Sequence, residues 1–494
     1  MGARGGAHVV AFPFPAKGHI LPMVQLSKSL ANHGIAITFV IATPHLASAR
    51  ALVEESFEDQ GQIQFVCFEI PPQFVDANFH NFLDLMRYLK QDKQEEFAGI
   101  IQQLMAPDVI ASNQPSFPIS HSSSGSVGSF RFSPPVCIIS DMLLNWTQDT
   151  SDAFKIPRYC LYTCPARGLS LSWHGIDWLN QGLVPFPPDA QERLEIPGFP
   201  PFLPIDLPEG FKQGTANTKF HVQQLFANFE KLKEANMVLV NTVYELESGI
   251  IAGLQKFHRI LTVGPLLLSH NDKSLFKVDA KENNCLQFLI QQPRSSVLYI
   301  CFGTIFTLPT KQLNELAVGL EASGVRFLWV IKTPKDEDGN LAPDITTFLP
   351  EGFMERTKDR GLVYTSWAPQ IQILAHPAVG GFLTHCGWNS IMESISMGVS
   401  MIAWPLWADQ MLNARFCVDV LNIAIAVDKK EIVGPEEVER VVRLLMEDGT
   451  NEIVRKNVKE LSKVVGQGIE PGGSSRKNLD LLVEELNSMN LLKQ

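Results

Sequence analysis

The sequence has no long apolar run. A helix that crosses a bilayer needs about 18 or more consecutive apolar residues, and no uncharged stretch of that length is present. The apolar start at residues 8–15 is short, contains two prolines and lacks a small-residue cleavage site, so it does not match a secretory signal peptide. We therefore expect a soluble, cytoplasmic protein.

Positive charge is also scarce. Lysine and arginine total 41 against 52 aspartate and glutamate residues, which gives a formal net charge of −11. This balance leaves no broad basic surface for a polyanion, so nucleic acid and anionic membranes are excluded as main partners. We expect small-molecule partners, and nothing in the sequence requires more than a monomer.

Cysteine patterns typical of metal sites are missing as well. The eight cysteines are scattered, mostly within apolar runs, and only Cys160 and Cys164 lie close together. No pair of CxxC motifs occurs, so neither a zinc site nor a disulfide framework is expected. The cysteines fit buried apolar positions in a reducing compartment.

The sequence does contain a regular alternation of short β-branched runs and longer amphipathic ones. At 494 residues it is too long for one hydrophobic core, because cores stop growing near roughly 250–300 residues. Strands separated by helices indicate parallel βαβ units with both sheet faces covered, so the predicted fold class is α/β with two doubly wound parallel-sheet domains. The expected strands are 8–14, 35–41, 63–70, 136–140, 159–163 and 237–243, and then 296–303, 326–332, 361–367, 380–386 and 400–405.

A polar stretch after residue 262 interrupts this pattern. We assign it as a linker at 263–283, between an N-terminal domain at 1–262 and a C-terminal domain at 284–473. The last segment, 474–494, is a predicted helix that we expect to pack back towards the first domain. Ligands of such sheets bind outside the carboxyl ends of the strands, so two facing domains predict a cleft between them.

The most informative segment is the 44-residue stretch 367–410. Its strand at 380–386 turns at Gly387 into a helix that we expect to start at Asn389 or Ser390. A helix start presents backbone N–H groups at the positive end of the helix dipole, which favours an anion. The segment has no lysine or arginine. A bound diphosphate would therefore be held by amides, hydroxyls and an imidazole.

Other residues of the segment add recognition groups. Trp367 offers an aromatic plate for a base, His385 precedes the helix start, and Asp409 with Gln410 forms a polar pair suited to sugar hydroxyls. Together they predict a site for a base, a diphosphate and a sugar.

Structural alternatives stay open for several of these residues. Ser390 and Glu393 match a capping box, which alone would explain both. Trp404 and Trp407 also fit core packing, and a histidine in a buried strand is often only a satisfied core residue.

The stretch 367–410 resembles the signature box of plant secondary-product glycosyltransferases, which are UDP-dependent, inverting enzymes of the GT-B fold. The opening WAPQ, the central HCGWNS with its following Glu393, and the closing Asp409-Gln410 match in residue type and spacing. The resemblance implies two facing Rossmann-like domains and a UDP-sugar donor. Further matching stretches are HVVAFPFPAKGHILPM, NTVYELE, SVLYICFGT, FLPEGF and GGSSRKNLDLLV.

The resemblance implies a role for each matching residue. Trp367 would stack on uracil while the Ala368 main chain hydrogen-bonds the base. Gln370 would reach the ribose, and Glu393 would take its hydroxyls. The residues implied to hold the diphosphate are Thr304, His385, Asn389 and Ser390, and those implied to read the sugar are Trp388, Asp409 and Gln410.

The closing residue of the box bears on the donor. Glutamine there, Gln410 in this chain, is usual among members that transfer glucose, whereas histidine often accompanies galactose. Trp388 fits glucose better than glucuronic acid, for which members with arginine at this position are known. The resemblance therefore implies UDP-glucose.

A sugar transfer with inversion needs a general base, because a hydroxyl is a poor nucleophile at pH 7. His19 stands beside Gly18 in a loop after the first strand, where a histidine can be incidental, but the resemblance implies that it is the base. Asp141 follows the strand at 136–140, where it can also be a helix N-cap, and the resemblance pairs it with His19. Thr163 matches a family threonine that contacts the donor sugar.

The acceptor pocket is expected in the first domain, around the loops after its strands. Apolar walls favour a flat phenolic or other lipophilic acceptor, and a phenol, with a pKa near 10 instead of roughly 16 for an alkanol, loses its proton more easily. The same side chains fit a core equally well. The candidate residues are Gly18, Phe82, Leu85, Met86, Met142, Leu143 and Trp146.

The sequence thus predicts an inverting UDP-glucose-dependent O-glucosyltransferase acting on a flavonoid or other phenol. The alternatives are the same fold with another UDP-sugar or another acceptor (a terpenoid, hormone or carboxylate) and a catalytically silent nucleotide-sugar-binding protein. An oxidoreductase is disfavoured, because no GxGxxG follows a strand. Asp336 and Asp338 have the DxD spacing of metal-dependent glycosyltransferases but stand in a polar loop remote from any phosphate-binding feature, so no metal or cofactor is expected.

Overall fold

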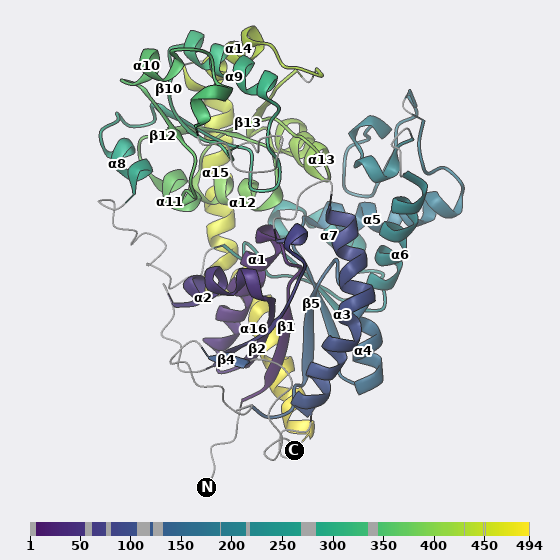
Figure 1. Ribbon diagram of the computed structural model, residues 1–494. Coiled ribbons are helices and arrows are strands. Elements are labelled where there is room, and N and C mark those ends of the chain that lie inside the picture. The colour runs from purple at the N-terminus through teal and green to yellow at the C-terminus, as the bar shows by residue number, and fades with distance from the viewer. Residues whose placement is uncertain are drawn as a thin grey trace. The chain divides into compact units, whose positions relative to one another are not determined.

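The chain divides into two compact units, which are described separately (Figure 1). Unit 1 comprises Met1–Ile205, Gly210–Asp272 and Gln467–Gln494, and unit 2 comprises Asp206–Glu209 and Lys273–Gly466. The computed structural model describes residues 6–54, 62–75, 81–105, 119–121, 132–187, 189–213, 218–267, 283–333, 344–428, 430–447, 449 and 451–493. Most of the expected linker, together with Asp336 and Asp338, lies outside these residues.

Unit 1 is built on an eight-stranded sheet in the order β4-β3-β2-β1-β5-β6-β7-β8. All neighbouring strands are parallel except β3 and β4. The central strands are continuous apolar runs because both sheet faces are covered, and every residue of β2 is buried. The strands are β1 His8–Phe12, β2 Ala36–Ala42, β3 Ile63–Phe68, β4 Ile119–His121, β5 Cys137–Asp141, β6 Arg158–Tyr162, β7 Met237–Val240 and β8 Ile260–Thr262.

Helices from both ends of the chain contribute to the core of unit 1. The buried cluster contains Met23 of α1, Val53 of α2 and Leu486 of α16 alongside the strand residues. The C-terminal helix therefore belongs to the same core as the first strand. The helices are α1 Lys17–Ala31, α2 Leu46–Glu54, α3 Phe82–Met105, α4 Thr147–Phe154, α5 Ala166–Asn180, α6 Thr218–Leu232, α7 Ser248–Leu254 and α16 Ser474–Lys493.

Unit 2 contains a six-stranded parallel sheet in the order β11-β10-β9-β12-β13-β14. Its core packs Leu316 of α9 and Val442 of α14 against strand residues such as Ile300 and Leu383. The strands are β9 Val297–Cys301, β10 Arg326–Val330, β11 Gly361–Tyr364, β12 Val379–Thr384, β13 Met401–Ala403 and β14 Ala424–Ala426. The helices are α8 Asn284–Ile290, α9 Thr310–Ser323, α10 Phe353–Thr357, α11 Gln370–Ala375, α12 Trp388–Met397, α13 Gln410–Arg415, α14 Pro435–Met446 and α15 Glu452–Ile469.

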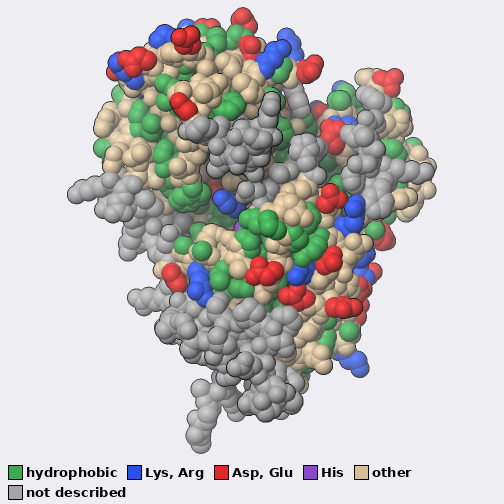
Figure 2. Space-filling model, in the orientation of Figure 1, with side chains coloured by type: hydrophobic (Ala, Val, Ile, Leu, Met, Phe, Trp, Pro, Cys, Tyr) green, Lys and Arg blue, Asp and Glu red, His purple; other side chains and the backbone are tan. Residues whose placement is uncertain are grey.

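The structure corrects two expectations about local elements. The three-residue strands β4 and β14 were not predicted, and α1 begins at Lys17, so His19 lies in the first turn of a helix and not in a loop. On the face drawn in Figure 2, acidic and basic side chains are interspersed, and the described residues there form no continuous basic patch.

Candidate active site

The first group of site residues lies at the carboxyl ends of β1 and β5 in unit 1. These strands are parallel neighbours, so the residues that follow β1 lie beside the last residue of β5. His19 Nδ1 lies 2.8 Å from Asp141 Oδ2. The Asp141 side chain is fully buried and that of His19 is 15% exposed. The structure thus brings together the two residues that the sequence pairs.

The contacts of Asp141 fix its partner's tautomer. An ionised carboxylate only accepts hydrogen bonds, so we assign the proton to Nδ1 of His19, which leaves the Nε2 lone pair of the neutral ring available. The second oxygen of Asp141 accepts from the Leu143 N–H at 2.9 Å. The N-cap alternative for Asp141 is wrong, because α4 starts at Thr147 with Trp146 as its N-cap.

Thr163 belongs to the same group, since its Oγ1 lies 3.2 Å from His19 Nδ1. The sequence did not single out Phe14, whose buried ring packs edge-on to the His19 ring at 5.5 Å and contacts the Phe82 ring at 5.1 Å. One side of the imidazole is therefore apolar. A phenylalanine in an apolar run gives no sequence signal for this position.

The acceptor candidates differ in burial. Met142, Leu143 and Trp146 are at most 8% exposed, and Trp146 packs against Phe12 and Phe97, as core side chains do. Leu85 is also fully buried. The candidates with partly exposed surface are Gly18, Phe82 and Met86.

The second group of site residues lies in unit 2, at the start of α12. The helix begins at Trp388 with Gly387 as its N-cap, and no side chain caps it. The capping-box alternative for Ser390 and Glu393 is therefore wrong. The first helical hydrogen bond runs from Ile391 N–H to Gly387 O, so the N–H groups of the first turn face out of the helix end, where an anion is favoured.

His385 lies against this helix start in a space formed by two glycines. A Cβ at Gly387 would lie 2.5 Å from His385 Nε2, and one at Gly303 would lie 2.8 Å from the ring. Burial lowers the pKa of His385 to about 4. The imidazole is therefore neutral at pH 7 and would meet a phosphate as a hydrogen-bond donor, not as a cation.

A chain of polar side chains connects α11 with α12. Tyr299 donates its hydroxyl to Gln370 Oε1 at 3.0 Å. The Gln370 amide nitrogen donates to Ser390 Oγ at 3.0 Å and to Glu393 Oε2. Burial raises the pKa of Glu393 to about 7, and the Gln370 hydrogen bond acts in the opposite direction. Tyr299, a buried strand residue, was missed from the sequence because its partner lies 71 positions away.

The four tryptophans of the segment have different surroundings. Trp367 is 68% exposed, which leaves its indole face accessible. Trp404 is buried in the unit 2 core against Phe302, as the core-packing alternative predicts. Trp388 is only 3% exposed, and Trp407 is partly buried.

The polar pair that closes the segment is held by its own backbone. Gln410 Oε1 accepts from the N–H groups of Leu406 and Trp407 at 2.9 and 3.0 Å, so only its amide nitrogen remains to contact a ligand. Asp409 accepts from Asn413 Nδ2 at 2.8 Å, and Asn413 also donates to Cys386 O at 3.0 Å. Asn413 thus connects the pair with the turn before α12, although it lies just beyond the segment.

Thr304 follows β9 and is exposed. Lys332 Nζ, at the end of the neighbouring strand β10, donates to the Thr304 carbonyl at 2.9 Å. The sequence placed no cation near the predicted diphosphate site, because Lys332 lies outside the 367–410 segment. Ala368 lies two residues before α11.

No metal-binding cluster and no membrane-spanning helix is found in the part of the chain that the structure describes. There, no group of three or more His, Cys, Asp and Glu residues is arranged to hold a metal ion. Within the same residues, none of the helices combines the length and the apolar character needed to cross a bilayer.

Comparison with known proteins finds relatives over nearly the whole chain. A family model described as UDP-glucoronosyl and UDP-glucosyl transferase matches residues 263–471, and one described as glycosyltransferase, N-terminal domain, matches residues 6–79. UDP-glycosyltransferase 72B1 of Arabidopsis thaliana is 34% identical over 96% of this chain and 95% of its own length. The anthocyanidin 5,3-O-glucosyltransferase of a Rosa hybrid cultivar is 32% identical over 97% and 99%.

A solved structure shares the fold of this chain. The structure of Phytolacca americana UGT2 complexed with UDP-2fluoro-glucose and pterostilbene matches with a TM-score of 0.79 and 28% identity, over 98% of this chain and 100% of that one. Two parallel-sheet, Rossmann-like units with this likeness define a sugar-transferring enzyme of the GT-B fold. The chain belongs to the UDP-glycosyltransferase family of plant secondary metabolism.

Proposed function

We propose that this enzyme is a UDP-glucose-dependent O-glucosyltransferase that inverts the anomeric centre and acts on a small lipophilic phenol. The observation that carries the proposal is the 2.8 Å contact between His19 and a fully buried Asp141, which leaves a basic imidazole nitrogen. The reaction is a single displacement. His19 Nε2 takes the acceptor proton, the acceptor oxygen bonds to the anomeric carbon, and the bond from that carbon to the diphosphate breaks as UDP leaves with its electron pair.

Asp141 would orient the imidazole and stabilise its positive charge once the proton has been transferred. Thr163, within hydrogen-bond reach of the same ring, would contact the donor sugar. The apolar side of the ring, formed by Phe14 and Phe82, suits an aromatic acceptor.

Unit 2 would bind the donor. The exposed indole of Trp367 would stack on uracil while the Ala368 main chain hydrogen-bonds the base, and Gln370 with Glu393 would take the ribose. The α12 start suits the diphosphate. The remaining proposed contacts are Thr304, His385, Asn389 and Ser390 to the diphosphate and Trp388, Asp409 and Gln410 to the sugar.

The choice of glucose and of a phenol rests on the relatives and on Gln410. The Rosa relative is named as a glucosyltransferase of anthocyanidin, and the Phytolacca structure contains a glucose derivative and pterostilbene. Anthocyanidins and pterostilbene both carry phenolic hydroxyls. The Gln410 amide, with its oxygen already bonded to the backbone, would donate to an acceptor atom of the sugar.

The test is glucoside formation and UDP release with UDP-glucose and a panel of phenols, for the wild type and His19→Ala. Loss of the base should lower turnover by about 10²–10⁴-fold and leave the affinity for UDP unchanged, since the residues proposed to bind the UDP moiety are in unit 2. UDP-galactose and UDP-glucuronic acid serve as donor controls. Binding of UDP-glucose without product from any acceptor would instead favour a silent nucleotide-sugar-binding protein, and an unchanged rate in His19→Ala would remove His19 from the mechanism.

A further inference from the structure

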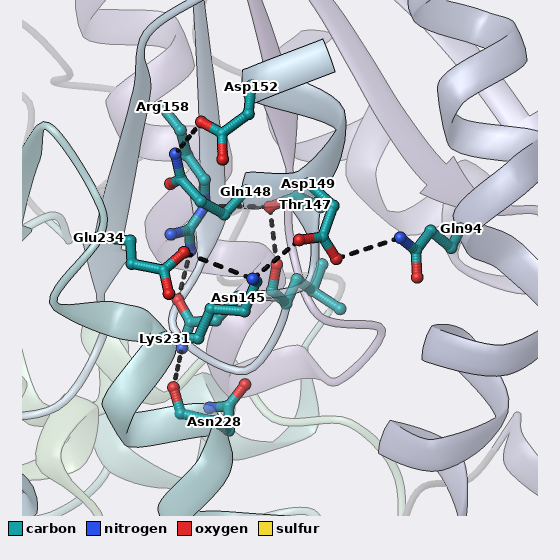
Figure 3. Close-up of polar contacts among 11 residues, drawn as sticks. Gln94, Asn145, Thr147, Gln148, Asp149, Asp152, Arg158, Asn228, Lys231 and Glu234 are labelled. Carbon is teal, nitrogen blue, oxygen red and sulfur yellow. Dashed lines mark hydrogen bonds and ion pairs between the residues drawn. The ribbon is translucent and has the colours of Figure 1, made fainter.

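The segment that follows Asp141 is held by a buried arginine. Arg158 is the first residue of β6, next to β5, and its side chain is fully buried. Its guanidinium contacts Asn145 in residues 142–146, which connect β5 with α4 (Figure 3). This segment, here called the β5–α4 loop, includes Leu143, the residue whose N–H binds Asp141.

The guanidinium binds the loop at both of its ends. Its Nε donates to Ser140 Oγ at 2.7 Å and to Thr147 Oγ1 at 3.0 Å, and one terminal nitrogen donates to Asn145 Oδ1 (Figure 3). Ser140 directly precedes Asp141, so Arg158 contacts residues on both sides of the carboxylate along the chain. The Thr147 hydroxyl also donates to Leu144 O at 2.7 Å, and its oxygen lies 2.8 Å from Ser140 Oγ.

Asn145 transmits this anchoring to the loop backbone. With its oxygen bound to Arg158, its amide nitrogen donates to Met142 O at 2.7 Å and to Asn228 O at 2.9 Å. Asn228 of α6 donates to the same Met142 carbonyl at 2.9 Å. The peptide between Met142 and Leu143 is therefore fixed from its carbonyl side, and its N–H is the group that Asp141 accepts.

Among the residues that the structure describes, none is a counter-ion bound directly to Arg158. Its acceptors are two hydroxyls and an amide, all uncharged, and its other terminal nitrogen, Nη1, is buried without a hydrogen-bond partner among the described residues. Burial lowers the pKa of Arg158, while the nearby charge of Asp141 acts in the opposite direction. A buried cation thus acts electrostatically on the carboxylate that holds His19.

The other titratable groups around this cluster do not replace that charge. Burial raises the pKa of the Cys160 thiol to about 12, so Cys160 is neutral. Lys231 pairs with Asp149 at 2.8 Å and with Glu234 at 3.3 Å, all with exposed surface. Asp152 accepts from the Gln148 amide on α4.

We infer that Arg158 is a positioning residue for the proposed base: it fixes the β5–α4 loop so that the Leu143 N–H orients Asp141, and its buried positive charge acts on the His19–Asp141 pair. The inference rests on the proposed function of His19 and Asp141. It assigns Arg158 no contact with substrate. Its effect should appear in the pH dependence of turnover and not in the affinity for the donor.

The test compares pH profiles of kcat/KM with UDP-glucose and a phenol accepted by the wild type. Removing a buried cation makes the His19–Asp141 pair easier to protonate, so Arg158→Met should move the acid limb to higher pH by about one pH unit. Arg158→Lys keeps the charge and should leave the limb in place. Lys231→Met, which removes a nearby cation with exposed surface, is the matched control and should also leave it in place.

A second pair of variants separates charge from geometry and does not depend on the folding of Arg158→Met. Asn145→Asp places a carboxylate on the guanidinium and should move the acid limb upward, as Arg158→Met does. Asn145→Ala removes the same amide contacts without adding charge, so turnover should fall while the limb stays. The KM for UDP-glucose should stay within about twofold of the wild-type value in all variants.

Two results would overturn the inference: an unmoved acid limb in folded Arg158→Met, or equal limbs in Asn145→Asp and Asn145→Ala. NMR titration of the ¹⁵N-labelled His19 ring, assigned by comparison with His19→Ala, measures the same effect without turnover. Absence of transfer by the wild type would contradict the proposed function. A His19 titration that does not differ between Asn145→Asp and Asn145→Ala would contradict the role of Arg158.

Discussion

The buried carboxylate of Glu393 makes a quantitative prediction about donor binding. Its pKa is raised to about 7 by burial. If the ribose hydroxyls donate to Glu393, as proposed, only the ionised carboxylate binds them fully. The ionised fraction is about nine-tenths at pH 8 and about one-tenth at pH 6, so the affinity for UDP-glucose should fall about tenfold between those pH values.

The direction follows from the raised pKa. Binding selects the ionised form, so below pH 7 it must release a proton, and affinity must increase as the pH rises. His385, with a pKa of about 4, stays neutral across this range and adds no pH dependence. UDP-glucose is the proper ligand, because the sugar esterifies its β-phosphate and so removes the ionisation that the terminal phosphate of free UDP has near pH 6.

Calorimetric titration at pH 6, 7 and 8, in buffers of different ionisation enthalpy, measures both the affinity and the released proton. Glu393→Gln should bind weakly, with an affinity that is constant over this range. Glu355→Gln is the control, because it removes an exposed carboxylate of α10 and should retain the tenfold change. A wild-type affinity that stays constant from pH 6 to 8 would refute both the protonation argument and the ribose contact.

Three further predictions concern single side chains. Trp367→Ala should weaken UDP-glucose binding by about 5- to 150-fold, the equivalent of roughly 1–3 kcal/mol of base stacking. The melting temperature should not change, because the indole is exposed. An unchanged calorimetric Kd would contradict the stacking role. Gly387→Ala should lower the affinity for UDP-glucose at least about tenfold, because the added Cβ displaces the His385 ring. Gly253→Ala is the control and should not change this affinity, since nothing lies within 4 Å of its added Cβ. Equal affinities in the two variants would show that His385 does not contact the donor. Burial lowers the pKa of His8 to about 4, so protonation of His8 favours the unfolded state below pH 6.5. Between pH 7 and 5 the free energy of unfolding, measured by urea titration, should therefore fall by about 2 kcal/mol more in the wild type than in His8→Gln. An equal pH dependence in the two proteins would contradict this prediction.

The fold could be predicted from the sequence to the extent that burial determines residue type. Strands such as β2, buried on both faces, are continuous apolar runs and were found within a residue or two at each end. The edge strands β4 and β14 have three residues each, too few to establish a pattern. His19 was expected in a loop, but α1 starts at Lys17 and has Pro22 as its sixth residue.

The site was predictable where neighbouring strand ends bring residues together and not where single side chains connect distant segments. His19 follows β1 and Asp141 ends the neighbouring parallel strand β5, so the sheet brings together two residues that the family resemblance had paired. Tyr299, Asn413 and Arg158 act through hydrogen bonds to partners that no local pattern links to them. The capping-box alternative failed because Gly387 takes the N-cap position, which places Ser390 inside the helix.

The two groups of residues have opposite effects on charged side chains. Their contributions to the pH dependence of the enzyme can therefore be separated. In unit 1 the buried carboxylate of Asp141 contacts a partly exposed histidine, and this stabilises the cation formed when His19 takes a proton. In unit 2 burial suppresses charge, since His385 is neutral and Glu393 titrates near pH 7. Glu393 should therefore determine how the affinity for the donor depends on pH. The His19–Asp141 pair should determine how kcat depends on pH. Glu393→Gln should make the affinity for the donor independent of pH and leave the pH dependence of kcat unchanged. The reason is that no described hydrogen bond connects Glu393 and its partners with His19.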